Sequence, residues 1–369
     1  MFSAFKRQDW LLNGVVFALM AAGLAMSFSV SPDLFAQQAG WVILGIILIF
    51  LFSQIDWRAL TTYRWMIVGL YLFGLLLLTV TYFFAPIIRN TRSWLVLGPV
   101  QFQVSELIKV IMIIFFAYYF ARRHIGIAHL GNILRSLFFL LPPVAFIFFQ
   151  PDMGSVIVLV GLWIGFLLVS GLRWKHLGIG FLLVALLLMV AWSGILKDYQ
   201  KERIVGLFQP NYDPLGVNYS TIQSKIAIGS AGIFGKGFQR GTQVQLGFLP
   251  EAATDFVFAG FTEEWGLLGA FVLVGLFLIM IFRITRIGIR AENNFLRFVC
   301  LGTVIMFLIQ FFINAGTAIG LVPVIGLTFP FLSYGGSSLL VNAILLGIVQ
   351  SARVYQSVVS DKGRGIAFL

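Results

Sequence analysis

A lone aspartate lies where a polar stretch of this sequence meets a long apolar run. Asp255 belongs to the segment LPEAATDFVFAGFTEEWG, residues 249–266, which also carries Glu251. Thr254 or Asp255 can cap the helix that follows, whose dipole favours a negative charge at its N-terminus. Asp255 can equally act as a general base that takes a proton from a hydroxyl group. Position alone leaves the two roles, which can coexist, evenly open.

Two further charged motifs lie at the edges of apolar runs. In SELIK, Glu106 and Lys109 are three residues apart, so a helix places them on one face, where they can form an ion pair. A buried pair of this kind more often stabilises a helix bundle than reacts, so we expect a structural role. In FQPDMGS, Asp152 follows Pro151, an order typical of a helix start, which favours a cap or a turn.

Two more acids, Glu263 and Glu264, follow Asp255 about two helical turns into the apolar run. Helical spacing places one or both near the side of Asp255. A charge this deep in an apolar run is expected to be the buried partner of a cation. Together with Asp152 and Glu251, these two acids are predicted to support the site.

The sequence lacks HExxH, paired cysteines and a P-loop, and its one cysteine, Cys300, can form no internal disulfide. The three histidines, His124, His129 and His176, all fall in short basic loops. Chemistry at the opposite, outer side must therefore rest on carboxylates and cations. That combination suits substrates rich in hydroxyls and phosphates, because carboxylates accept protons and Lys or Arg hold a leaving phosphate.

The elements that position these residues are predicted to be membrane-spanning helices. The chain has 369 residues, of which 60% are hydrophobic and 11% charged, whereas soluble domains carry about 25% charged residues. The apolar runs are continuous rather than alternating, which favours an all-α polytopic membrane protein over a β-barrel. Ten runs are predicted to span: 10–30, 39–54, 64–85, 105–121, 133–149, 153–170, 175–195, 256–282, 298–320 and 335–355. The second is short, and the fifth contains Pro142 and Pro143.

Lysines and arginines predict the orientation of these spans. With the N-terminus in the cytoplasm, the short outer loops hold Arg89 and Arg92 alone. The inner segments then hold Lys6, Arg7, Arg58, Arg64, Arg122, Arg123, Arg135, Arg173, Lys175, Arg283, Arg286, Arg290, Arg297, Arg353, Lys362 and Arg364. This asymmetry predicts that both termini are cytoplasmic. It also explains the net charge of +11 without a nucleic-acid partner.

One long outer loop, about 196–254, interrupts the series of spans between the seventh and eighth runs. Its stretch YSTIQSKIAIGSAGIFGKG, residues 219–237, predicts a helix on or in the membrane surface, followed by glycine turns. A loop of this length without a function would be unusual. We see no second domain, so residues 1–369 are predicted to form one integral membrane domain.

Several ordered blocks of the sequence resemble the SEDS (shape, elongation, division and sporulation) family of bacterial membrane proteins. They are RSWLVLGPVQFQVSELIKV, FQPDMGS, DPLGVNYSTIQSK, IQSKIAIGSAGIFGKGFQRGTQVQLGFLPEAATDFVFAGFTEEWGLLG and LVPVIGLTFPFLSYGGSSL. The motif QSKIAIGS resembles the rod-shape members of the family more than the division members. Two positions depart from the family pattern: Val104 stands where a proline is usual, and Gln101 where some rod-shape members carry arginine.

The resemblance implies a ten-helix protein of the bacterial cytoplasmic membrane, with Asp255 at the position of the family's essential aspartate. It implies a peptidoglycan glycosyltransferase that polymerises lipid II outside the membrane, for cell elongation and rod shape. It also implies that the protein works with a class B penicillin-binding protein, a transpeptidase, within the elongation machinery. Glu106 and Lys109 fall on residues thought to form a structural pair.

On this reading Asp255 is the base of an inverting reaction, and cations hold the leaving pyrophosphate. The candidates are Arg92, Lys225, Lys236 and Arg240, each of which is otherwise a solvated loop charge or a lipid headgroup contact. No cofactor is required, although a divalent cation, Mg²⁺ or Mn²⁺, can bridge carboxylate and pyrophosphate. The alternatives are a lipid II flippase, which needs a polar path through the whole bilayer, and a non-catalytic scaffold for the transpeptidase.

Overall fold

The computed structural model describes residues 7–88, 91–98, 100–123, 130–171, 198–209, 213–216 and 218–366, together with Gly178 and Gly194. Helices dominate these residues, and a two-stranded antiparallel hairpin is their one sheet. The elements are α2 (Trp10–Val30), α3 (Pro32–Ser53), the 3-10 helix η1 (Trp57–Thr61), α4 (Arg64–Phe84), β1 (Trp94–Leu97), β2 (Val100–Gln103), α5 (Val104–Arg123), α6 (Leu130–Phe149), α7 (Met153–Val169), α9 (Asp198–Phe208), α10 (Tyr219–Ser230), α11 (Thr242–Gln245), α12 (Val257–Arg290), α13 (Asn294–Ile319) and α14 (Gly336–Ile366).

Eight described helices are long and apolar enough to cross a membrane, namely α2 to α6 and α12 to α14. The shorter apolar helix α7 has 17 residues. These helices coincide with nine of the ten predicted spans. The predicted run 175–195 lies outside the described residues, apart from Gly178 and Gly194, so the number ten stays a prediction.

Two weak predictions differ in detail from the structure. The second span was predicted at 39–54, whereas α3 begins at Pro32, because Ser31 accepts a hydrogen bond from the amide of Asp33 and a proline is favourable at a helix start. The run with Pro142 and Pro143 is nevertheless one helix, α6, with both prolines inside it.

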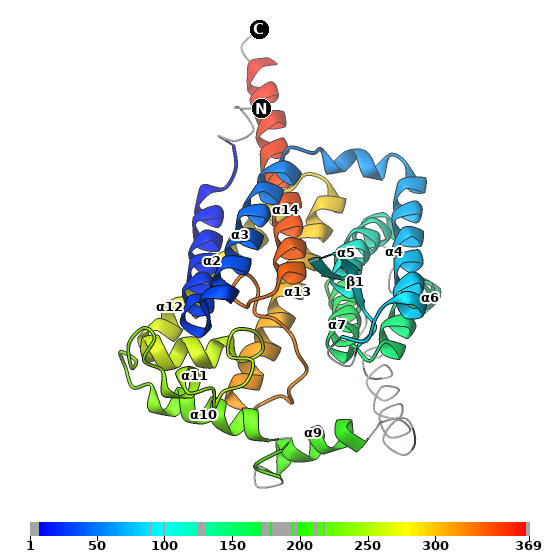
Figure 1. Ribbon diagram of the computed structural model, residues 1–369. Coiled ribbons are helices and arrows are strands. Elements are labelled where there is room, and N and C mark those ends of the chain that lie inside the picture. Colours follow the sequence, from blue (N-terminus) through cyan, green and yellow to red (C-terminus); the bar gives the residue numbers. More distant parts are fainter. Residues whose placement is uncertain are drawn as a thin grey trace.

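The centre of the bundle is built from α5, α13 and α14, whose residues are mostly buried in their apolar stretches. Both α13 and α14 pack against α5, and α14 also packs against α3. In Figure 1, α2, α3 and α12 flank α14 on one side, and α4 to α7 form the other side of the bundle. Large apolar side chains such as Trp65 and Phe138 are exposed on the outer helices, as expected for surfaces that face lipid.

The polar segment after the seventh predicted span contains α9, α10 and α11. The helix predicted within residues 219–237 is confirmed as α10, and its Ser224 hydroxyl donates to the carbonyl of Ala318 at 2.7 Å, which ties α10 to the end of α13. Figure 1 shows α9, α10 and α11 together at the end of the bundle opposite the last turns of α14.

Helix α12 is interrupted at Gly266, whose φ of 73° and ψ of −177° are not helical. The interruption frees backbone groups, and the loop segment 232–237 satisfies them. The amides of Leu267 and Leu268 donate to the carbonyls of Gly232 and Ile233, both at 3.0 Å. In the other direction, two amides of the loop donate to the carbonyls of Glu263 and Glu264, again at 3.0 Å. The break is thus a joint between the loop before α12 and α12 itself, because unpaired backbone groups are costly in a membrane protein.

Replacing Gly266 by alanine tests this joint. A Cβ at Gly266 would lie 2.3 Å from the amide nitrogen of Gly235 and from the carbonyl oxygen of Ile233. We expect Gly266→Ala to lower the free energy of unfolding by about 2 kcal/mol or more, because the positive φ and the clash both oppose a side chain. Thermal unfolding in detergent measures this loss. Gly275→Ala, in the same helix with no atom within 4 Å of its Cβ, is the control and should change stability little.

Candidate active site at the N-terminal end of α12

The loop that carries Asp255 is held by one buried side chain of α13. The amide nitrogen of Asn314 donates to the carbonyl oxygens of Leu327 at 2.8 Å and Asp255 at 3.0 Å, and more weakly to that of Thr254 at 3.4 Å. Asn314 is 1% exposed, so these bonds form away from water. They fix the backbone of Asp255 against the segment after α13.

The segment 320–335 adds further bonds to the same loop. The hydroxyl of Ser333 donates to the carbonyl of Thr254 at 2.8 Å, and the amide of Tyr334 donates to that of Ala253 at 2.7 Å. Gly326, with φ of 78°, lies close to the acid, since a Cβ there would be 3.7 Å from Oδ2 of Asp255. Two segments far apart in the sequence therefore meet at this carboxylate.

Asp255 itself is partly exposed and lies two residues before the start of α12 at Val257. The N-cap of α12 is Phe256, so neither Thr254 nor Asp255 caps the helix as the sequence allowed. The reason is a local turn in which the amides of Thr254 and Phe256 both donate to the carbonyl of Glu251, while the Thr254 hydroxyl donates to the carboxylate of Glu251 at 2.7 Å. Asp255 thus reaches the surface without the cap role.

The acids Glu263 and Glu264 are buried at the break of α12. Glu263 forms an ion pair with Lys236 at 2.7 Å and accepts the amides of Gln243 and Val244 at 3.0 and 3.3 Å. The expectation of a buried acid with a cation partner is confirmed for Glu263. Glu264 instead accepts a hydrogen bond from the Ser29 hydroxyl of α2. Both acids thereby join the outer loop and α2 to α12.

The other predicted cations lie apart from one another. Lys225 is exposed on α10 and lies over Gly320, where a Cβ would be 2.5 Å from its Nζ. Lys225 and Asp255 therefore border the two ends of the segment 320–326. Arg240 is exposed in a turn, where its backbone amide donates to the carbonyl of Gly237. Arg92 is exposed before β1.

Asp152 is the N-cap of α7, as the sequence favoured. Its Oδ1 accepts the amide of Ser155 at 3.1 Å, and its Oδ2 accepts the Ser105 hydroxyl at 2.6 Å and the side-chain amide of Gln103 at 3.0 Å. These bonds tie the start of α7 to the start of α5. The departures from the family pattern lie in the same region, with Val104 buried at the first position of α5 and Gln101 exposed on β2.

Glu106 and Lys109 form the predicted ion pair inside the bundle. The distance from Lys109 Nζ to Glu106 Oε1 is 2.5 Å, and Lys109 is fully buried. Neither side chain lies on the surface, which fits a structural role rather than contact with a substrate.

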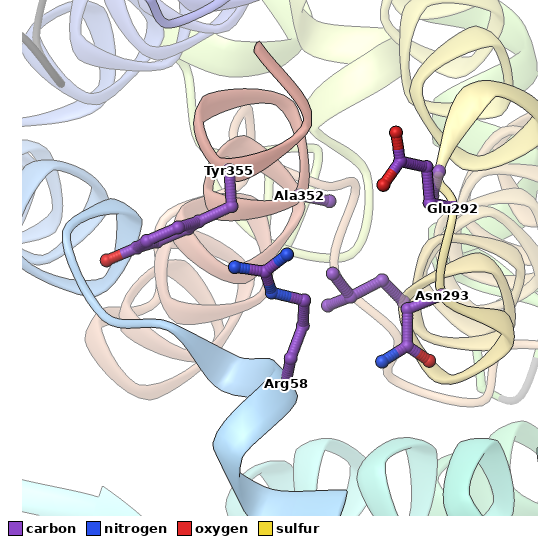
Figure 2. Close-up of a pocket in the computed structure, with 7 residues that line it drawn as sticks. Arg58, Glu292, Asn293, Ala352 and Tyr355 are labelled. Atoms are coloured by element: carbon purple, nitrogen blue, oxygen red, sulfur yellow. The ribbon is translucent and has the colours of Figure 1, made fainter. Parts of the chain in front are cut away.

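A cavity of about 350 Å³ lies at the other end of the molecule, between η1, the turn from α12 to α13, and α14. Figure 2 shows Arg58 beside Tyr355, with Glu292 and Asn293 across the cavity. The Arg58 guanidinium donates to the Asp56 carboxylate at 2.8 and 2.9 Å, which lowers the pKa of Asp56 and raises that of Arg58. Because this cation is already paired, we do not place the chemistry here.

Sequence reasoning missed Asn314, Ser333 and Gly326. Asn314 carried a signal, since an amide in an apolar run must find partners, but its partners are backbone groups that no pattern reveals. Among the described residues, no three side chains of His, Cys, Asp or Glu are grouped to hold a metal ion.

The fold and the site define a class: a helical membrane protein that presents a partly exposed acid and several cations at one end of its bundle. Such a site suits a polar molecule anchored in the membrane. The chain belongs to the family described as cell cycle protein, which comprises FtsW, RodA and SpoVE and matches residues 8–358. This confirms the resemblance drawn from the sequence motifs.

Relatives from two bacteria match nearly the whole chain. The peptidoglycan glycosyltransferase MrdB of Escherichia coli (strain K12) is 35% identical over 351 residues, which cover 94% of this chain and 93% of MrdB. The stage V sporulation protein E of Bacillus subtilis (strain 168) is 32% identical over 362 residues, 94% of this chain and 97% of that protein.

Solved structures share the fold. A chain of a peptidoglycan synthase complex that coordinates polymerization and crosslinking matches with a TM-score of 0.81 and 33% identity, over 95% of this chain and 98% of that chain. The rod shape determining protein RodA of Thermus thermophilus matches with a TM-score of 0.69 and 28% identity, over 94% and 96%.

Breaking the Glu106–Lys109 pair should destabilise the protein. Lys109→Met leaves a buried carboxylate without its cation, which typically costs about 3–5 kcal/mol, whereas Arg58→Met breaks the partly exposed pair with Asp56 and should cost less than about 1 kcal/mol. Unfolding in detergent compares the two. The charge-swapped double variant Glu106→Lys/Lys109→Glu should regain much of the loss. If Lys109→Met is as stable as the parent protein, the structural role is wrong.

Proposed function

We propose that this chain is a peptidoglycan glycosyltransferase of the RodA type, which polymerises lipid II into glycan strands at the outer face of the bacterial cytoplasmic membrane. Its contribution would be to cell elongation and rod shape. The observation that carries the proposal is the partly exposed Asp255 at the end of α12, with its backbone fixed by Asn314. The 35% identity to MrdB over 94% of the chain supports the same activity.

The reaction joins two lipid-linked disaccharides. The 4-hydroxyl of one GlcNAc attacks C1 of the MurNAc of another chain, so a C–O bond forms while the bond from C1 to the lipid pyrophosphate breaks. The proton of the hydroxyl passes to the carboxylate of Asp255, and the pyrophosphate leaves with the bonding electrons. The donor is α-linked and the product β-linked, so a single base opposite the leaving group suffices and no covalent intermediate with the enzyme is needed.

The leaving pyrophosphate needs positive charge near Asp255. Of the four candidates, Lys225 is favoured, because it borders the same segment, 320–326, as Asp255. Lys236 is favoured less, since its charge is already offset by Glu263. Arg92 and Arg240 are exposed and stay candidates. A Mg²⁺ or Mn²⁺ ion shared between Asp255 and the pyrophosphate is compatible with this arrangement.

We further propose ten spans with both termini in the cytoplasm. The concentration of Lys and Arg in alternate loops supports this orientation. The start of α2 and the later part of α14 lie at one end of the bundle (Figure 1), where the amide of Asp9 donates to Gln350 at 2.9 Å. Asp255 then faces the outer side, where both substrates present their sugars while their lipid tails remain in the bilayer.

The partner we propose is a class B penicillin-binding protein, which crosslinks the strands that this chain makes. The similarity to a chain of a synthase complex that couples polymerization and crosslinking supports it. A broader elongation machinery would contain both proteins.

One assay separates the glycosyltransferase from two other functions. Purified protein, with and without the transpeptidase, is supplied with lipid II in vesicles. A flippase would move lipid II across the bilayer without making polymer. A scaffold would do neither and would only change the activity of the transpeptidase. The glycosyltransferase alone yields glycan strands.

The assignment of Asp255 as the base predicts the behaviour of one conservative variant. Asp255→Asn should fold and insert normally but lose polymerisation by at least about a hundredfold, because the amide cannot accept the proton. Gel analysis of the glycan product measures the rate, and unfolding in detergent checks the fold. Asp33→Asn is the matched control, since Asp33 is an exposed acid at the start of α3 and should leave the rate unchanged. Polymerisation by Asp255→Asn at the parent rate would refute the assignment.

A further inference from the structure

Two polar side chains lie deep in the bundle with no partner for either of their polar atoms among the described residues. They are Gln310 of α13, which is fully buried, and Asn342 of α14, which is 1% exposed. The second oxygen of Glu106 on α5 is also buried without a partner. Because both atoms of each amide are free, exchanging the amide N and O in either residue leaves the same problem.

Helix registers place these groups at one level. Phe120 of α5 contacts Phe298 of α13 with ring centroids 6.4 Å apart, and a Cβ at Gly302 would lie 2.9 Å from Ile113. The two helices are therefore antiparallel. Eight residues outward from Gly302 on α13 is residue 310, and eight residues outward from Ile113 on α5 is residue 105. Gln310 is thus level with Glu106.

Asn342 reaches the same level from α14. The hydroxyl of Ser337, at the start of α14, accepts the amide of Gln103, next to the start of α5, at 2.9 Å. Both helices run inward from this contact and pack against each other. Five residues inward from Ser337 is Asn342, and six residues inward from Gln103 is Lys109. The free amides and the Glu106–Lys109 pair therefore lie within about one helical turn of one another in depth.

Five unpaired polar atoms at this depth cannot be left without partners. Buried polar groups in folded proteins are almost always hydrogen-bonded. The cost of five unpaired ones would rival the whole stability of an ordinary domain, and a membrane offers no bulk water to relieve it.

The chemistry of the five atoms identifies the ligand. Glu106 Oε2, Gln310 Oε1 and Asn342 Oδ1 need donors, whereas the amide nitrogens of Gln310 and Asn342 need acceptors. A metal ion would satisfy the oxygens alone, and an anion the nitrogens alone. A ligand that both donates and accepts satisfies all five, and water is the smallest such ligand.

We propose that α5, α13 and α14 enclose a binding site for ordered water, formed by Gln310, Asn342 and the Glu106–Lys109 pair. The water completes the hydrogen bonds of the buried ion pair. It also reaches Asn314, one turn outward from Gln310, whose Oδ1 is buried and unpaired while its nitrogen holds the carbonyl of Asp255. Gln310 and Asn342 are thereby positioning residues for the acid, a step that rests on the proposed function.

Radiolytic hydroxyl-radical labelling tests the water site without any substrate. X-rays convert bound water to hydroxyl radicals in place, and these oxidise the nearest methionine even when bulk solvent cannot reach it. Met306 lies one turn inward from Gln310, whereas Met26 of α2 packs against Gly260 of α12, on a helix whose neighbours are α3, α11 and α12, and both methionines are at most 1% exposed. We expect Met306 to be oxidised to the sulfoxide and Met26 to remain intact. Equal labelling of the two would overturn the proposal.

A variant in which the amides are removed gives the second test. Gln310→Leu/Asn342→Leu replaces both amides with apolar side chains and so deletes the four amide atoms, and labelling of Met306 should be lost. Persistent labelling in this variant would also overturn the site, and if the variant fails to fold, the comparison of the two methionines in the parent protein still decides.

The link to the reaction has its own readout in polymerisation kinetics. The double variant should lower kcat by about ten- to a hundredfold with KM for lipid II little changed, since the acid is displaced rather than the substrate contacts. Lost labelling with unchanged kcat would refute the positioning role but not the water site. Neither result depends on Asp255→Asn, which tests the proposed function separately.

Discussion

The site depends on one amide group that bridges two loops. Asn314 lies inside an apolar helix, where its N–H groups must be satisfied by the protein. The acceptors it finds are carbonyls of the loop before α12 and of the loop after α13. These carbonyls need donors as much as Asn314 needs acceptors, because the contact is buried. The requirement to satisfy both sides fixes the backbone of Asp255 to a scaffold helix rather than leaving it on a free loop.

A second constraint acts through the length of α12. Near its outer end, the break at Gly266 is filled by backbone groups of the segment 232–237. At its inner end, the Arg283 guanidinium donates to Asp9, which precedes α2. Asp9 is in turn linked to Gln350 of α14. The helix that leads to Asp255 is therefore joined to other elements near both of its ends, and this limits how far the acid can move.

The sequence was informative wherever hydrophobic periodicity or charge spacing decides the structure. It predicted nine described helices, the Glu106–Lys109 pair and the cap at Asp152, since each depends on neighbours within one segment. It did not predict the break at Gly266. A glycine inside an apolar run is compatible with a continuous helix, and the break becomes evident only from its bonds to the segment 232–237.

The same limit explains the partners of the charged residues in the loop. Lys236 and Glu263 are 27 residues apart and meet because the loop folds back on α12, which no local pattern encodes. Thr254 is a residue type that often caps a helix, yet its hydroxyl donates to the carboxylate of Glu251 in the preceding turn. Tertiary contacts of the loop thus decided what the local signals left open.

Exposure separates Asp255 from the buried acids of the molecule. Removing a carboxylate from water costs several kcal/mol unless a cation or hydrogen bonds compensate it, and three buried acids of this protein have a cation as partner. Glu263 binds Lys236, Glu106 binds Lys109, and Asp9 binds Arg283. Burial keeps these three carboxylates from contact with a substrate. Asp255 combines a fixed backbone with a partly exposed side chain, and this exposure is what the proposed attack by a membrane-anchored sugar requires.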